Sequence, residues 1–205
     1  MPRIVLGTSN VRKARELVEL LGPWGFELRT LADFPDALDV EETGETFAEN
    51  AALKATQQAR HLQQWVLAED SGVAVDALHG APGVYSARYA GENADDAANN
   101  RRLLQELGDT PLAQRTAHYV CHITVADPQG QIRAESEARC NGRITFEPHG
   151  TGGFGYDPLF EIVEYHRTFG ELGPAVKAAL SHRSRAVARI LPPLRELVRS
   201  GKWSS

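Results

Sequence analysis

Two adjacent carboxylates, Glu69 and Asp70, follow a short apolar run at 65–68 that has the composition of a buried strand. An ionised carboxylate is costly to bury unless it meets a cation, so a pair at the end of a strand indicates a metal site or a proton-transfer site. An exposed turn is the alternative, because Ser71 and Gly72 come next and both residue types are common in turns. Taken alone, these four residues favour the turn, since turns far outnumber active sites.

The segment that follows favours a functional site. A rigid turn at 80–83 contains two glycines and a proline. After it, one short loop brings together hydroxyl, cationic and aromatic groups from Tyr85, Ser86, Arg88 and Tyr89. A loop of this composition is suited to facing a ligand, and it raises the weight of a functional role for the two carboxylates.

The start of the chain predicts a strand at 4–6, a polar turn and then a helix. The turn supplies Thr8, Ser9 and Asn10, and Lys13 lies one turn into the helix. A helix N-terminus with a nearby ammonium group suits a phosphate, because free N–H groups, the helix dipole and the cation act on the same anion. Helix capping by Ser9 or Asn10 explains the same residues equally well.

An acidic segment at 38–45 precedes a helix that a capping box at its start predicts over 46–61. Acidic residues at this position usually complement the helix dipole. The alternative is that Glu41 or Glu42 joins Asp70 around a magnesium ion, because Mg²⁺ is commonly held by carboxylates from separate loops.

The stretch at 147–160 is rich in glycine and carries Phe154 and Tyr156 between the glycines. Glycine permits a close backbone approach and the two rings offer flat faces, a combination that suits recognition of a planar base. A mobile surface loop is the alternative. Recognition of a base is favoured over a mobile loop, because large apolar groups in a flexible loop need a partner or a core.

A C-terminal helix is predicted after Ser181, which is suited to be its N-cap. His182 and Arg183 would then lie in the first turn, where cations oppose the helix dipole. An anion or an electron-rich ring system held against this pair would explain the arrangement.

The composition limits the class of protein. With 205 residues, of which 42% are hydrophobic, the chain can form one large domain, predicted at 1–205. A net charge of -5 argues against a protein that binds nucleic acid through a basic face. Cys121 and Cys140 lack metal or redox spacing and are expected to be buried thiols in a reducing compartment. No signal peptide or membrane span is recognisable, so a cytoplasmic protein is expected.

The remaining pattern is that of a mixed α/β fold. A strand is predicted at 26–31 and a helix at 95–107. Two alternating segments at 113–127 and 132–141, joined by a turn, predict a long antiparallel hairpin.

Five blocks of the chain, taken in order, resemble the family of inosine triphosphate pyrophosphatases, and most closely its bacterial branch. The blocks are TSNVRK at 8–13, EETGETFAENAALKA at 41–55, EDSGVAVDALHGAPGVYSARYAG at 69–91, GTGGFGYDPLF at 150–160 and SHR at 181–183. The resemblance implies an elongated mixed sheet with flanking helices and two lobes around a central nucleotide cleft. It also implies a homodimer and Mg²⁺-dependent hydrolysis of ITP, dITP and XTP to the monophosphate and pyrophosphate.

By the same resemblance, Asp70 would be the base that activates water. Glu41 or Glu42 would share magnesium with Asp70, and the choice between the two glutamates stays open. The residues implied in substrate binding are Thr8, Ser9, Asn10, Lys13, Ser71, Phe154, Gly155, Tyr156, Asp157, Lys177, His182 and Arg183.

Two other functions stay open at this point. One is a pyrophosphatase for modified pyrimidine triphosphates, which a panel of nucleotides would separate from the first. The other is a nucleotide-binding protein without catalytic activity on the same fold. The presence of Asp70, Glu41, Glu42 and Lys13 argues against the second.

Overall fold

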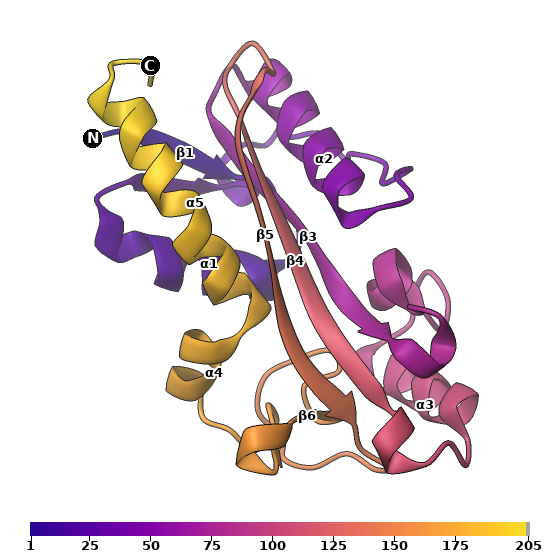
Figure 1. Cartoon of the computed structure of the whole chain (residues 1–205). Coiled ribbons are helices and arrows are strands. Elements are labelled where there is room, and N and C mark those ends of the chain that lie inside the picture. The colour runs from indigo at the N-terminus through magenta and orange to yellow at the C-terminus, as the bar shows by residue number, and fades with distance from the viewer. Residues whose placement is uncertain (204–205) are drawn as a thin grey trace. The chain divides into compact units, whose positions relative to one another are not determined.

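The computed structural model, drawn in Figure 1, describes residues 1–203. These residues form two compact units. Unit 1 contains the segments Met1–Asp70 and Cys121–Ala138 and the described chain from Arg183 onward. Unit 2 contains Ser71–Val120 and Arg139–His182. Three strands of the sheet therefore contribute residues to both units.

The sheet is mixed and has seven strands in the order β2-β1-β3-β4-β5-β6-β7. The strands are β1 Arg3–Leu6, β2 Glu27–Thr30, β3 Val66–Val75, β4 Thr116–Ala126, β5 Ile132–Ile144, β6 Phe160–Ile162 and β7 Arg167–Thr168. β1 pairs in parallel with β2 and β3, whereas β6 pairs antiparallel with β5 and β7. The predicted mixed α/β class is thereby confirmed, and β4 and β5 form the predicted hairpin.

Helices cover both faces of the sheet in unit 1 (Figure 1). They are α1 Val11–Leu21, α2 Phe47–Leu62 and α5 His182–Arg199. One core joins Leu17 of α1 and Ile190 of α5 to Cys121 and Ile123 of β4. A second core places the small residues of α2 against β1 and β3 on the other face. The alternation of side chains along each strand feeds both cores.

Unit 2 has a core of its own, formed by two helices and by the parts of β3, β4 and β5 that belong to this unit. These helices are α3 Asp96–Leu107 and α4 Pro174–Leu180. Leu103 and Leu107 of α3 pack with Val73 and Val75 of β3 and with the ring of Phe160. α3 ends at Gly108, as the sequence predicts, and its N-cap is Asp95, two residues after the predicted cap at Asn93.

The predicted end of the third strand at Ala68 is wrong. β3 continues from Val66 to Val75 through all four residues expected to form a turn. The strand continues because the residues after that segment are apolar: Val73 and Val75 pack in the core of unit 2. Glu69 and Asp70 are tolerated in the strand because cations meet them, as described below. The acidic pair is thus held rigidly in a buried strand.

The C-terminal segment closes over the first core of unit 1 through a cluster of aromatic rings. The ring of Trp203 stacks on Trp65 at 4.1 Å with an interplanar angle of 11°, and its centroid is 5.7 Å from that of Phe26. Such pairs add to the free energy of burial. This stacking lets us predict the cost of removing the outer ring.

Trp203→Ala is expected to lower the free energy of unfolding by about 2 kcal/mol, because a half-buried stacked ring is lost. Urea unfolding followed by far-ultraviolet circular dichroism measures the change. Trp24→Ala is the control: Trp24 is 41% exposed, and the guanidinium carbon of Arg195 lies 4.4 Å from its ring centroid. An equal loss in both variants would contradict the stacking argument.

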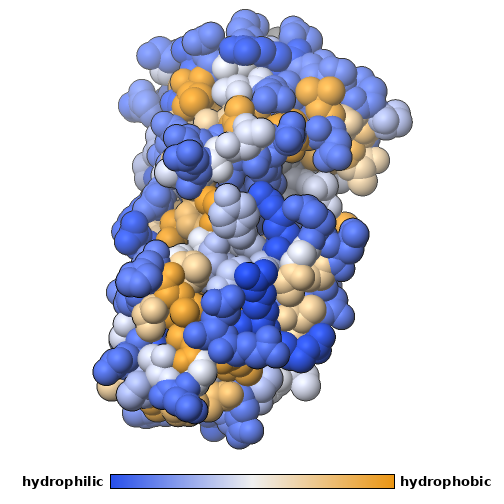
Figure 2. Space-filling view, turned by 90° about the vertical axis from the view of Figure 1, so that its right-hand side faces the viewer, coloured by the Kyte–Doolittle hydropathy of each residue, from blue (hydrophilic) through white to orange (hydrophobic). Residues whose placement is uncertain are grey.

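The surface drawn in Figure 2 has small groups of hydrophobic residues separated by hydrophilic ones, the usual pattern of a face in contact with water. Within residues 1–203, no helix is long and apolar enough to cross a membrane. Cys121 and Cys140 are buried thiols that are not joined in a disulfide, as predicted.

Candidate active site

Glu69 lies at the centre of a buried ion network in unit 1. Its two oxygens accept hydrogen bonds from Nε and Nη2 of Arg183 at 2.8 and 2.9 Å, and the Cys121 thiol donates to Oε2 at 2.9 Å. Lys13 Nζ lies 3.7 Å from Oε1, and Arg183 also donates to Glu16. Glu69 and Arg183 are 0% and 1% exposed. The bidentate geometry is therefore what makes this buried charge tolerable.

The protonation states in this network follow from its charges. Burial by itself raises the pKa of Glu69, but Arg183 and Lys13 outweigh it and hold the pKa well below its usual value. Burial and the adjacent Glu69 raise the pKa of the Cys121 thiol. Glu69 is accordingly ionised and Cys121 carries its proton at neutral pH, as the hydrogen bond between them requires.

Asp70 follows Glu69 in β3, so its side chain projects to the opposite face of the sheet, toward α2. Lys54 Nζ lies between two carboxylates there, 3.1 Å from Asp70 Oδ1 and 3.2 Å from Glu42 Oε1. Burial raises the pKa of Asp70, and Lys54 and Lys13 oppose that rise without cancelling it. Lys54 stays protonated because Asp70 and Glu42 raise its pKa against the effect of burial.

One oxygen of this group is open to a further ligand. Asp70 is 5% exposed, and its Oδ2 atom is buried without a hydrogen-bond partner. A buried carboxylate oxygen without a partner fits a cation or a bound water molecule, since leaving it bare is costly. Across residues 1–203, no group of three or more histidine, cysteine or acidic side chains is positioned to hold a metal ion. Of the predicted trio, Glu42 joins Asp70 through Lys54, whereas Glu41 is exposed.

The acidic loop is fastened to the start of α2. Gly44 N–H donates to Asn50 Oδ1 at 2.8 Å, and the N–H groups of Glu45 and Thr46 donate to Glu49 Oε2 at 2.7 and 3.1 Å. Thr46 Oγ1 accepts from Glu49 N–H, which completes the predicted capping box. Three consecutive amides are thus fixed by the helix that also carries the lysine between the carboxylates.

The polar turn after β1 is organised by Asn10. Its Oδ1 accepts from the N–H groups of Arg12 and Lys13 at 3.0 and 3.2 Å, so Asn10 is the N-cap of α1. Thr8 Oγ1 accepts from Asn10 N–H at 3.2 Å. The capping alternative is correct for Asn10, and phosphate binding by Thr8, Ser9, Asn10 and Lys13 stays a prediction.

Unit 2 gathers four of the residues predicted to bind the substrate. Asp157 Oδ2 accepts from Lys177 Nζ at 2.6 Å and from Phe154 N–H at 2.8 Å. Lys177 Nζ also lies 4.4 Å from the centroid of the Phe154 ring. Tyr156 is buried and its hydroxyl donates to the Ser86 carbonyl at 2.8 Å. Residues 147–160 are called the aromatic loop from here on. Around Phe154 this loop is held in place by the ion pair between Asp157 and Lys177.

The other predicted residues of unit 2 lie at defined positions. The ring of His182 stacks on Tyr119, with centroids 4.6 Å apart and an interplanar angle of 8°. Tyr119 donates from its hydroxyl to Asp157 Oδ1 at 3.4 Å. His182 is thus linked to the aromatic loop through Tyr119. Ser71 is half-buried in β3, directly after Asp70.

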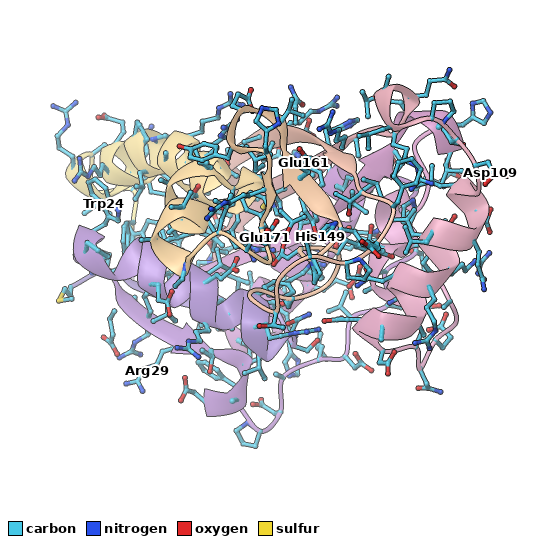
Figure 3. All side chains as sticks on the ribbon, turned by 90° about the horizontal axis from the view of Figure 1, so that it is seen from below. Trp24, Arg29, Asp109, His149, Glu161 and Glu171 are labelled. Atoms are coloured by element: carbon cyan, nitrogen blue, oxygen red, sulfur yellow. The ribbon has the colours of Figure 1, made fainter. Side chains whose placement is uncertain are left out.

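The start of the glycine-rich segment is tied to the turn after β7. His149 and Glu171 lie close together in Figure 3. Thr168 connects them: its N–H donates to Glu171 Oε2 at 2.9 Å and its hydroxyl donates to the His149 carbonyl at 2.7 Å. Hydrogen bonds from Thr168, and then the charge of His149, lower the pKa of Glu171. This tie fixes where the aromatic loop begins.

Sequence reasoning missed several residues of these sites, above all Lys54, Glu16 and Tyr119. Lys54 follows Asn50 by one helical turn, so both project from one face of α2, and a lysine among small residues was the available signal. Glu16 and Tyr119 have no comparable signal, because their partners are distant in sequence.

Comparison with known proteins identifies the family of this chain. The sequence model of the Ham1 family matches residues 4–192, and the chain belongs to that family. The dITP/XTP pyrophosphatase of Rhodopirellula baltica is 55% identical over 202 residues, which cover 98% of this chain and 97% of that protein. The dITP/XTP pyrophosphatase of Geobacillus kaustophilus is 50% identical and covers 97% of each chain.

Solved structures agree as well. A HAM1 protein from Coxiella burnetii superposes with a TM-score of 0.87 at 38% identity, covering 96% of this chain and all of that one. The nucleoside-triphosphatase, a dITP/XTP pyrophosphatase, of Mycobacterium abscessus gives a TM-score of 0.76 at 43% identity, with 93% and 99% coverage. The resemblance found in the sequence is confirmed.

Proposed function

We propose that this chain is an enzyme that hydrolyses the non-standard purine nucleoside triphosphates dITP, XTP and ITP to the monophosphate and pyrophosphate. The observation that carries the proposal is the buried Asp70, with one carboxylate oxygen held by Lys54 and the other left without a partner. Relatives at 50% and 55% identity over nearly the whole chain, named dITP/XTP pyrophosphatases, support the substrate class.

The reaction needs a carboxylate that accepts a proton. Asp70 Oδ2 would hold a water molecule and take its proton as the water oxygen attacks the α-phosphorus. The bond from the α-phosphorus to the bridging oxygen breaks, and pyrophosphate leaves with the electron pair. Lys54 keeps Asp70 Oδ1 occupied, which directs the reactive water to Oδ2.

Mg²⁺ is the cofactor that the donor set suits best. Carboxylate oxygens are the preferred ligands of this ion, and Asp70 and Glu42 are the two that a single ammonium group already draws together. When bound, the ion would neutralise charge on the phosphate oxygens. Glu41 is the less favoured candidate because it is exposed.

Lys13 and the polar turn would bind the triphosphate. Lys13 has 15% of its side chain exposed and is held near Glu69, so it is positioned while its ammonium group can still meet an anion. Thr8 and Ser9 would add hydroxyl groups. This assignment rests on the chemistry of the turn and on the resemblance.

Unit 2 would read the base. The ring of Phe154 offers a stacking face, and the ring of His182 or backbone amides would donate to the 6-oxygen of hypoxanthine or xanthine. A site that makes such bonds rejects adenine, which carries an amine at this position. Arg183 would act through the network with Glu69, which occupies its guanidinium group in this structure.

Product analysis tests the proposal. Purified protein with ITP or dITP and Mg²⁺ is expected to release IMP or dIMP and pyrophosphate in equal amounts, measured by anion-exchange chromatography. Turnover of ATP, GTP and modified pyrimidine triphosphates should be much slower. Release of orthophosphate, or a preference for a pyrimidine triphosphate, would overturn the proposal. Omitting Mg²⁺, or adding a chelator, is expected to abolish turnover.

We infer from the resemblance that the protein is a cytoplasmic homodimer without nucleic-acid partners. The net charge of -5 supports the last point, because nucleic-acid binding requires a basic surface. Sedimentation equilibrium of the full chain tests the dimer.

A further inference from the structure

The first two turns of α3 hold two loops of unit 2 by their backbones. Asp96, Asn99 and Asn100 all direct their side chains to peptide groups outside the helix. Asn99 and Asn100 are only 3% and 8% exposed. Asparagine and aspartate are poor residues for a helix interior, and a buried amide is costly unless its hydrogen bonds are made. Their presence here is explained by the loops that they bind.

The first loop is the aromatic loop of the proposed base site. Gly155 N–H donates to Asp96 Oδ2 at 2.8 Å, and the Gly155 carbonyl accepts from Asn100 Nδ2 at 3.1 Å. Both polar groups of Gly155 are therefore fixed by α3. Gly155 has a φ of +62°, in the left-handed region that favours glycine. Because Gly155 lies between Phe154 and Tyr156, fixing it sets the direction of both rings.

The second loop is the segment 83–91, whose first part, Gly83–Arg88, forms a 3-10 helix. Asn99 Oδ1 accepts from Ala90 N–H at 2.8 Å, and its Nδ2 donates to the Ala87 carbonyl at 3.1 Å. The two loops are also joined directly, since the Tyr156 hydroxyl donates to the carbonyl of Ser86. α3 and Tyr156 thus cross-link the two loops through five hydrogen bonds, each to a backbone group.

We propose that Asp96 and Asn100 are positioning residues for purine specificity, which they control by fixing the Gly155 peptide and with it the Phe154–Asp157 segment. The proposal rests on the function proposed above. Neither residue is assigned a contact with the substrate. Discrimination between bases requires donors and a stacking face held to within roughly 0.5 Å, and residues that hold such groups before the ligand arrives supply that precision.

The expected defect is selective. When the loop is loosened, the correct base loses well-aligned hydrogen bonds, whereas a base that never made them loses little. Binding of the preferred substrate should therefore weaken while chemistry at the phosphate continues. This separates a positioning role from a purely structural one, which would change thermal stability alone.

Asn100→Ala is the main test, with dITP and dATP as the two substrates, because adenine carries an amine where hypoxanthine carries the 6-oxygen. We expect KM for dITP to rise about tenfold with kcat within about twofold, the effect of losing one hydrogen bond of about 1.4 kcal/mol. The ratio of kcat/KM for dITP over that for dATP should fall by a similar factor. Arg101→Ala, an exposed neighbour on the same helix, is the matched control and should leave these values unchanged.

Two further variants keep the test decisive. Asp96→Asn retains an acceptor oxygen for Gly155 N–H and should behave like the wild type, whereas Asp96→Ala should reproduce the loss of selectivity. Asn100 is buried and its alanine variant could fail to fold. Asp96 is half-buried, so Asp96→Ala is expected to fold and can then replace Asn100→Ala in the test. Hydrogen exchange should show faster exchange at 153–157 in the alanine variants, with no change in β4, independently of any activity.

The outcomes are distinguishable. If the wild-type protein releases no pyrophosphate from dITP, the proposed function fails, and the exchange experiment still tests the link between α3 and the loop. If the wild type is active and selective but Asn100→Ala and Asp96→Ala keep the selectivity ratio, the inference is overturned while the proposed function stands. A fall in melting temperature with unchanged KM and unchanged exchange at 153–157 would also overturn it.

Discussion

Asp70→Asn is expected to lower kcat for ITP about a thousandfold while leaving the affinity for ITP within a few fold. Asparagine has the same shape, and its carbonyl oxygen still accepts the hydrogen bond from Lys54 that Asp70 Oδ1 accepts at 3.1 Å. The amide cannot take a proton from water, and removal of a general base costs about two to four orders of magnitude. The variant should therefore bind substrate and fail to cleave it.

Two measurements are needed to establish that result. Pyrophosphate release gives kcat, and isothermal titration with ITP and Mg²⁺ gives the affinity of the inactive variant. Asp39→Asn is the matched control, because Asp39 is an exposed acid in the loop that precedes α2. Unchanged turnover in Asp70→Asn would sink the assignment of Asp70 as the base, and a loss of binding equal to the loss of turnover would assign it to substrate binding.

The sequence identified the acidic pair better than its setting. Glu69 and Asp70 were singled out by the cost of burying adjacent acids, and both are buried and meet a cation in the structure, whereas the catalytic role of Asp70 stays a prediction. Their placement at a strand end was wrong because local turn chemistry at 71–72 competes with tertiary pairing that only the fold reveals. Lys54 neutralises Asp70 from a helix sixteen positions earlier in the chain, and periodicity cannot show such a pairing.

Elements with strong local signals were predicted well. α2 has its capping box at Thr46 and Glu49, and α3 ends at Gly108, each set by residues within one turn. The cross-links of unit 2 were not predictable. Asn100 bonds to Gly155 and Tyr119 stacks on His182 across more than fifty residues, so no local pattern records either contact.

Arg183→Met is expected to lower the free energy of unfolding by about 3–5 kcal/mol, because it removes one partner of a buried ion pair and leaves the other charged. Arg183 supplies both hydrogen bonds that neutralise the fully buried Glu69. Cys121 remains as a donor to Glu69 but carries no charge, and Lys13 is more distant at 3.7 Å. Neither can replace the guanidinium group.

A double variant separates two contributions to the free energy of unfolding: the cost of leaving Glu69 unpaired and the stabilisation by the Glu69–Arg183 ion pair. In Glu69→Met with Arg183→Met neither charge of the pair remains, and stability should recover by about 2 kcal/mol relative to Arg183→Met. Arg195→Met, an exposed arginine on the same helix, is the control and should change stability by less than about 1 kcal/mol. Urea unfolding gives all four values, and a double variant less stable than Arg183→Met would contradict the argument.

The same pair makes stability depend on pH with a definite sign. The folded pKa of Glu69 lies below the ordinary value of 4.5, so in acid the unfolded chain takes up the proton first. The stabilisation is therefore complete above pH 4.5 and is lost as the pH falls from there toward the folded pKa. In Arg183→Met the remaining effect of burial raises the pKa of Glu69, and this contribution should change sign. The free energy of unfolding is measured for both proteins between about pH 6 and about pH 3. If the wild type and Arg183→Met lose stability in parallel over this range, Glu69 does not govern the loss of stability in acid.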